Sequence, residues 1–177
     1  MKRFSTPLLA LLTLTALAGC ATTPANPPPM FCPQVAVLQQ ASSLTEFLPG
    51  QTGVAAQITQ AQITGVAGAC NLRAKKHLLA LSFQVGFAAT SGPANHSATL
   101  SLPYFVAITR DDHIIAEQHY SIDMSFKGDL AATQAVTRSF TFNFPNQPAS
   151  GNVQVLVGFR LTPAQLAYAA AHPLAAP

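Results

Sequence analysis

The fold is decided by the stretch Leu79-Ala80-Leu81-Ser82-Phe83-Gln84-Val85-Gly86-Phe87-Ala88-Ala89. Large apolar residues alternate here with small or polar ones, and a period of two residues places them on one face of an extended chain. The alternation predicts a β-strand at residues 76–89 with one face in a hydrophobic core and the other in water. The same period recurs on both sides of this stretch, so the chain is predicted to be all-β.

The other strands are predicted from the same alternation, and turn residues separate them. In residues 54–68 the apolar parity slips between Ile58 and Ile63, and a bulge or a glycine bend at Gly65 or Gly68 would explain the slip. Residues 33–48 are expected to form an edge strand or a loop. The remaining strands are expected at residues 98–108, 114–126, 136–144 and 153–161.

The connection Arg110-Asp111-Asp112 carries a prediction about register, because the apolar residues on both sides of it must face one core. A two-residue loop would pair even-numbered residues of the first strand with odd-numbered residues of the second. The pattern therefore favours a three-residue loop, with Ile114 and Ala116 on the core face. This loop predicts three pairs: Thr109 with His113, Ile108 with Ile114, and Leu100 with Ile122.

The segment Thr162-Pro163-Ala164-Gln165 predicts a helix start, with threonine as N-cap, proline at the first position and glutamine at the third. His172-Pro173 should end the helix near Ala171. So short a helix is unstable alone, so Leu166 and Tyr168 or Ala170 should dock on the domain.

About seven strands and one short C-terminal helix predict an antiparallel β-sandwich of the immunoglobulin or fibronectin kind, with a small closed barrel as the alternative.

The first twenty residues have the organisation of an export signal. Lys2-Arg3 precedes an apolar segment, residues 8–18, and small residues lie before a cysteine. The apolar segment is shorter than the roughly 20 residues of a transmembrane helix. Leu17-Ala18-Gly19-Cys20 resembles the lipobox of bacterial lipoproteins. The resemblance implies cleavage before Cys20, fatty acylation (palmitate or similar chains) of that cysteine and, with Ala21 next, anchoring on the periplasmic side of the outer membrane.

Three parts of the chain follow from this reading. Residues 1–19 are the signal peptide, residues 20–31 are the lipidated cysteine with a tether, and residues 32–177 are the β-sandwich domain. Four of the ten residues 21–30 are proline, which favours an extended polyproline conformation. At about 3.1 Å per residue, the tether would hold the domain roughly 30 Å from the lipid surface.

Charge excludes a nucleic-acid partner. Removal of Lys2 and Arg3 with the signal peptide turns nine basic residues into seven, against six acidic ones. The mature chain therefore carries a formal net charge of only +1. Its basic cluster, Arg73, Lys75 and Lys76, is too small for a nucleic-acid-binding patch.

Cys32 and Cys70 are the cysteines that remain after lipidation. An oxidising compartment favours a structural disulfide between them, and neither has the CxxC neighbour of a redox or metal pair. The closed loop of 39 residues would contribute about 4 kcal/mol to stability on the chain-entropy model.

A second resemblance covers most of the mature domain. The segments that carry it are Cys32-Pro33, residues 102–108 and residues 157–166, and they are similar to a group of alphaproteobacterial envelope lipoproteins. The resemblance implies an envelope protein with one domain, and it assigns no site residue.

No catalytic, cofactor or metal residue is predicted. His113, Glu117 and His119 are expected to share the outward face of one strand, where two of them could reach one ion, but a metal site needs three or four ligands. The chain lacks a Gly-x-Ser-x-Gly motif, and Asp111-Asp112 suits a turn better than acid–base chemistry.

Phe105 and Ile115 lie on otherwise polar faces and are a possible partner surface. The expected register places Phe105 opposite Glu117 and Ile115 opposite Ala107, so the two would be close. The C-terminal helix or residues 33–48 could instead cover them, and the need of the helix to dock favours covering.

The sequence therefore predicts a non-enzymatic, membrane-anchored binding or scaffolding module for envelope proteins. The alternatives are a periplasmic protein that binds a small ligand or a metal, and an envelope enzyme whose site has no sequence signature.

Overall fold

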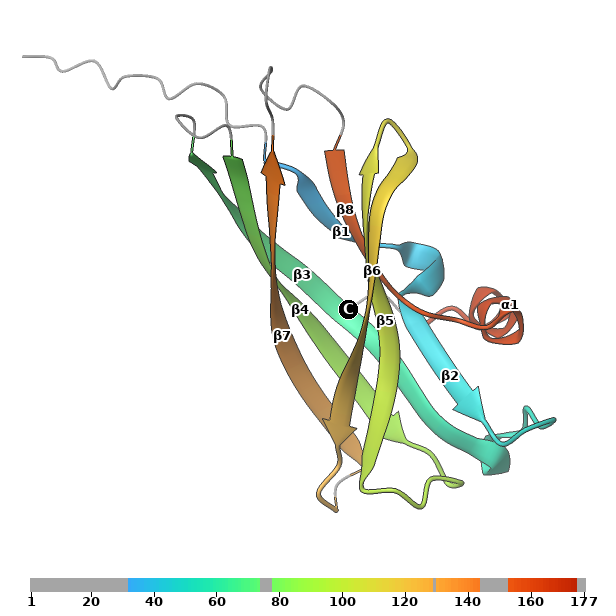
Figure 1. Cartoon of the computed structure of the whole chain (residues 1–177). Helices are drawn as coiled ribbons and strands as arrows, with labels where there is room; N and C mark the ends of the chain where they lie inside the picture. Colours follow the sequence, from blue (N-terminus) through green and yellow to red (C-terminus); the bar gives the residue numbers. More distant parts are fainter. Residues whose placement is uncertain (1–31, 74–77, 129, 144–152, 175–177) are drawn as a thin grey trace, which may run out of the picture.

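Two four-stranded sheets pack face to face in the computed structural model, which describes residues 32–73, 78–128, 130–143 and 153–174 (Figure 1). The strand order is β1-β8-β5-β6 in the first sheet and β2-β3-β4-β7 in the second. The elements are β1 (Gln34–Val37), β2 (Ser43–Phe47), β3 (Gln57–Arg73), β4 (Leu78–Ser91), β5 (Thr99–Arg110), β6 (His113–Ser125), β7 (Ala131–Asn143), β8 (Val153–Phe159) and α1 (Pro163–Ala171), with short 3-10 turns η1 (Gln39–Ala41) and η2 (Val54–Ala56).

The alternating stretch forms the middle of β4 and supplies the centre of the core. Phe83, Val85 and Phe87 are at most 1% exposed, whereas Ser82 and Gln84 on the opposite face are exposed. Buried residues of β5, β6 and β8 face them from the first sheet: Leu102, Tyr104, Val106, Ile122, Met124, Val155, Val157 and Phe159. The predicted β-sandwich is confirmed.

Residues 33–48 contain two edge strands rather than one. β1 pairs with β8 and β2 pairs with β3, so the chain changes sheets across η1. The β1–β8 pair is parallel, which corrects the expectation of purely antiparallel pairing. The immunoglobulin- or fibronectin-like topology stays a prediction.

The hairpin between β5 and β6 turns over two residues, so the predicted three-residue loop is wrong. Arg110 pairs with His113, and Asp111 and Asp112 have φ angles of 49° and 65°. A two-residue hairpin of type I′ requires a positive φ at both central residues, and aspartate tolerates this conformation.

A bulge in β6 restores the agreement between the apolar faces. Thr109 pairs with Ile114 and Ile108 pairs with Ala116, so Ile115 is an extra residue. Beyond the bulge even residues pair with even residues, as the hydrophobic pattern requires. The pairs differ by two positions from the predicted ones, since Leu102 lies opposite Ile122 and Leu100 opposite Met124.

The bulge also changes which residues of β6 face the core. Ile114 was expected inward but is 62% exposed: it lies before the bulge and pairs with Thr109 instead of Ile108, on an edge strand with no neighbour on its other side. Ala116 pairs with core residue Ile108 yet is exposed, because β6 is an edge strand with no neighbour on its other side.

The parity slip in β3 is a second bulge. The register with β4 shifts between Ile63 and Gly65, so the predicted bulge at Gly65 is confirmed. The register with β2 shifts as well, before Ile63, because Gln57 and Thr59 pair with adjacent residues and Ile58 is skipped. Gly86 of β4 makes room for the extra residue, since a Cβ there would lie 2.5 Å from Thr64 Oγ1.

The C-terminal helix α1 begins and ends where the sequence predicts. Thr162 Oγ1 accepts a hydrogen bond from the Gln165 backbone N–H (3.2 Å), and Gln165 Oε1 accepts one from the Thr162 N–H (2.9 Å). The ring of Tyr168 meets that of Phe47 on β2 edge-on, with centroids 5.0 Å apart. Leu166 is 44% exposed, so its expected docking is wrong.

None of the helices in the described residues has the length and apolar character needed to cross a bilayer.

Candidate interaction surfaces

The predicted disulfide between Cys32 and Cys70 is formed, with Cα atoms 5.7 Å apart. It links the residues just before β1, in the first sheet, to β3 in the second. The predicted signal peptide (residues 1–19), the predicted lipidation site Cys20 and the predicted tether (residues 20–31) lie outside the described residues.

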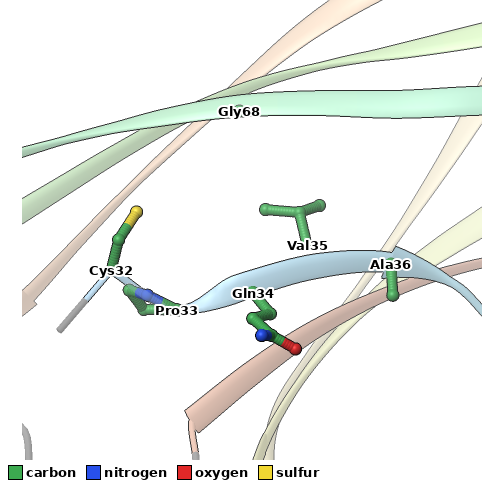
Figure 2. A pocket seen from close by; sticks show the side chains of 6 residues that line it. All are labelled: Cys32, Pro33, Gln34, Val35, Ala36 and Gly68. Carbon is green, nitrogen blue, oxygen red and sulfur yellow. The ribbon is translucent and has the colours of Figure 1, made fainter.

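A hollow of about 390 Å³ lies beside the disulfide, between β1 and β3. Figure 2 shows Val35 pointing toward Gly68, with Gln34 and Ala36 pointing the other way. A Cβ on Gly68 would lie 3.2 Å from Val35 Cγ2, so the two strands approach closely here. The six lining residues are Cys32, Pro33, Gln34, Val35, Ala36 and Gly68, and they offer neither an acid–base group nor a metal ligand set.

Phe105 and Ile115 do not form the single patch expected from the sequence. Phe105 pairs with His119 rather than Glu117, and Ile115 has no direct partner because it is the bulge residue. The structure therefore corrects the register that placed them side by side.

Each residue has its own surroundings. Phe105 is half-buried and lies over Gly158, where a Cβ would be 3.0 Å from the Phe105 ring and 2.9 Å from Ala41 Cβ. Ala41 belongs to η1, within the segment expected as a cover. Ile115 is 49% exposed.

The polar face of β6 brings together two of its three candidate metal ligands. His119 Nε2 lies 2.6 Å from Glu117 Oε1. His113 pairs with Arg110 before the bulge, which gives it the parity of the opposite face. Within the described ranges, no three His, Cys, Asp or Glu side chains converge on a possible metal position.

A cluster around Arg138 was not predicted from the sequence. Arg138 pairs with the core residue Phe83, so its side chain starts on the inner face of edge strand β7. Its guanidinium carbon lies 4.4 Å from the ring centre of Tyr120 and 5.7 Å from that of Tyr104, and Nη1 donates to the Thr137 carbonyl (3.2 Å). The sequence does contain a signal for this position: Arg138 is an even-numbered residue between Val136 and Phe140, so it lies on the same face of the strand as these apolar residues.

Two polar atoms in this cluster are buried without a partner among the described residues, Tyr104 Oη and Arg138 Nε. Burial raises the pKa of Tyr104, and the nearby positive charge of Arg138 opposes this rise. Arg138 has no carboxylate oxygen within 4.0 Å in the described part of the chain, where the one ion pair is Glu117 with His119. The cluster therefore holds a half-buried cation that contacts two aromatic rings and a backbone carbonyl, and no carboxylate among the described residues.

The buried hydroxyl of Tyr104 predicts a specific loss of stability in alkali. Because its pKa is raised in the folded state, the unfolded chain ionises first, and wild-type stability should fall as pH rises above about 10. Tyr104→Phe should remove this fall and change the free energy of unfolding at pH 7 by no more than about 1 kcal/mol, since the hydroxyl has no partner. Urea unfolding of both proteins at pH 7, 9.5 and 11 measures it; parallel losses would contradict the assignment.

Comparisons with known proteins bring no further information: no protein family, curated protein or solved structure matches this chain.

Proposed function

We propose that the protein is a lipid-anchored component of the bacterial envelope, and that its β-sandwich is a non-enzymatic binding or scaffolding module for other envelope proteins. The observation that carries this proposal is the Cys32–Cys70 disulfide next to the lipobox-like segment and tether. Structural disulfides persist in oxidising compartments such as the periplasm, which is where cleavage before Cys20 would deliver the domain.

The surfaces of the domain support binding more than catalysis. The hollow beside the disulfide has no acid–base group, and the Glu117–His119 pair lies on an exposed sheet face. A nucleophile or general base needs a partner that orients it in a site from which water can be excluded. Extended sheet surfaces on a tethered domain suit contacts with other proteins.

The anchor is tested by Cys20→Ser, with Thr22→Ser as the matched control. The native chain and the control should incorporate labelled palmitate and sediment with the outer membrane. Cys20→Ser should incorporate none and leave the outer-membrane fraction, because acyl burial supplies about 0.8 kcal/mol per CH₂ and the anchor depends on it. Fractionation with mass spectrometry of the N-terminal peptide measures both. A native chain that is unacylated and soluble would refute the proposal.

A further inference from the structure

Three of the four edge strands of the described sandwich carry features that prevent pairing with another chain. β1 has only four residues. β2 has five, with a register shift between Glu46 and Phe47, and α1 lies against it. β6 is long, but it contains the bulge at Ile115 and the exposed charges of Glu117 and Asp123.

The fourth edge strand, β7, lacks these features. Its 13 residues pair with β4 without a register shift, and they include no proline and no lysine. Arg138 is its one charged residue. Figure 1 shows β7 along the outside of the second sheet. A long, regular and nearly uncharged edge is a template for strand addition.

The hydrogen-bond pattern identifies the groups that β7 offers. The Ser91 N–H donates to the Leu130 carbonyl (2.7 Å), and bonded and non-bonded pairs alternate along an antiparallel ladder. The odd-numbered residues of β7 therefore turn their N–H and C=O groups away from β4. Six of them have exposed, small side chains: Ala131, Thr133, Ala135, Thr137, Ser139 and Thr141.

Arg138 supplies the charge preference of this edge. Its bond to the Thr137 carbonyl brings the guanidinium to the free side of the strand, because Thr137 is one of the outward-turned residues. Its Nε has no acceptor, and no carboxylate lies within 4.0 Å, among the described residues. An acidic side chain opposite Arg138 on an added strand would supply the missing carboxylate.

A second copy of the chain fits this edge less well. β7 runs from residue 131 to 143, so full-length antiparallel pairing with itself would centre on Thr137 and set Arg138 opposite Val136 of the copy. The two arginines would then be diagonal neighbours, where like charges repel.

We infer that β7 is the binding edge of the module, and that its partner is an extended segment with an acidic residue that adds to the second sheet as a fifth strand. This inference rests on the proposed binding function and names the class of partner. The added strand gains affinity from main-chain hydrogen bonds, and Arg138 selects for the acidic residue.

The test uses the full-length chain in detergent and two fluorescent peptides, Thr-Val-Thr-Glu-Thr-Val-Thr and the same peptide with lysine in place of glutamate. Anisotropy titrations should show at least roughly tenfold tighter binding of the glutamate peptide, because a charge-assisted hydrogen bond forms with one peptide and like charges meet with the other. Arg138→Gln should abolish the discrimination.

Ala135→Pro removes one outward N–H of β7 and leaves the hydrogen bonds between β7 and β4 in place. It should weaken binding of the glutamate peptide at least roughly tenfold. Ser121→Pro removes the equivalent outward N–H on β6 and should leave binding unchanged. Amide hydrogen exchange of the native chain gives a reading that does not depend on the proline variants folding. The peptide should slow exchange at odd residues of β7 and at none of β6.

The inference would be overturned by no binding of the glutamate peptide, by equal binding of both peptides, or by protection confined to another strand. A dimer in sedimentation experiments that Ala135→Pro dissociates would assign the edge to a second copy instead, and also overturns it. Cys20→Ser leaves this edge intact, so a failure of the anchor and a failure of the edge are separate results.

Discussion

Replacing Phe87 with alanine is expected to lower the free energy of unfolding by about 3–5 kcal/mol. The Phe87 side chain is 1% exposed, and its ring centroid lies 5.0 Å from that of Tyr104 and 5.9 Å from that of Phe159. These two rings belong to the opposite sheet, so Phe87 fills the space between the layers. Alanine would lose the transfer free energy of the ring and leave a cavity that the paired strands cannot close.

Two further variants serve as controls for Phe87→Ala. Phe87→Leu keeps most of the apolar volume and should cost less than half as much as alanine. Gln84→Ala changes an exposed side chain on the other face of the same strand and should stay within about 0.5 kcal/mol of wild type. Urea unfolding with an unchanged slope measures all three. A loss below about 1 kcal/mol for Phe87→Ala would place the side chain outside a close-packed core.

Removing the disulfide by Cys32→Ala with Cys70→Ala is expected to cost about 4 kcal/mol. The bond closes a loop of 39 residues, whose freedom in the unfolded chain it restricts. It also holds β1, a strand of four residues that pairs with β8 alone. Since small domains have only about 5–15 kcal/mol of stability, this loss is a large share of the total.

Reduction of the native chain with dithiothreitol should reproduce the loss, and Cys20→Ser should not, since Cys20 takes no part in the bond. Hydrogen exchange should accelerate first in β1 and its partner β8. If the double variant unfolded at the same urea concentration as the native chain, the disulfide would contribute nothing to stability, and the entropic account would be wrong.

The helix and the strands were predictable because their causes are local. Thr162, Pro163 and Gln165 meet the requirements of a helix start within four residues, and α1 begins there. The alternation from Leu81 to Ala89 needs one inner and one outer face, and any sheet that buries it satisfies the pattern.

The hairpin shows where the pattern was insufficient. Apolar parity required even residues of β5 to meet even residues of β6, and a three-residue loop or a two-residue loop with a bulge satisfies this requirement equally. The structure has the second solution, with the bulge at Ile115. The displaced register separated Phe105 from Ile115 and moved His113 to the other face from His119, so it changed both candidate sites.

By itself the sequence determined most elements of this protein: the alternating strands from β3 onward, the residues that β4 buries, the start of the helix, and the cysteines that are available to pair. These follow from the period of the chain and from contacts over a few residues. Only the tertiary structure decided the register, the parallel β1–β8 pair and the meeting of Arg138 on β7 with Tyr120 on β6. The physical reason is that these features depend on how the two sheets stack and on which edge strands stay unpaired. The periodicity of one strand does not specify which residues of another strand lie opposite it.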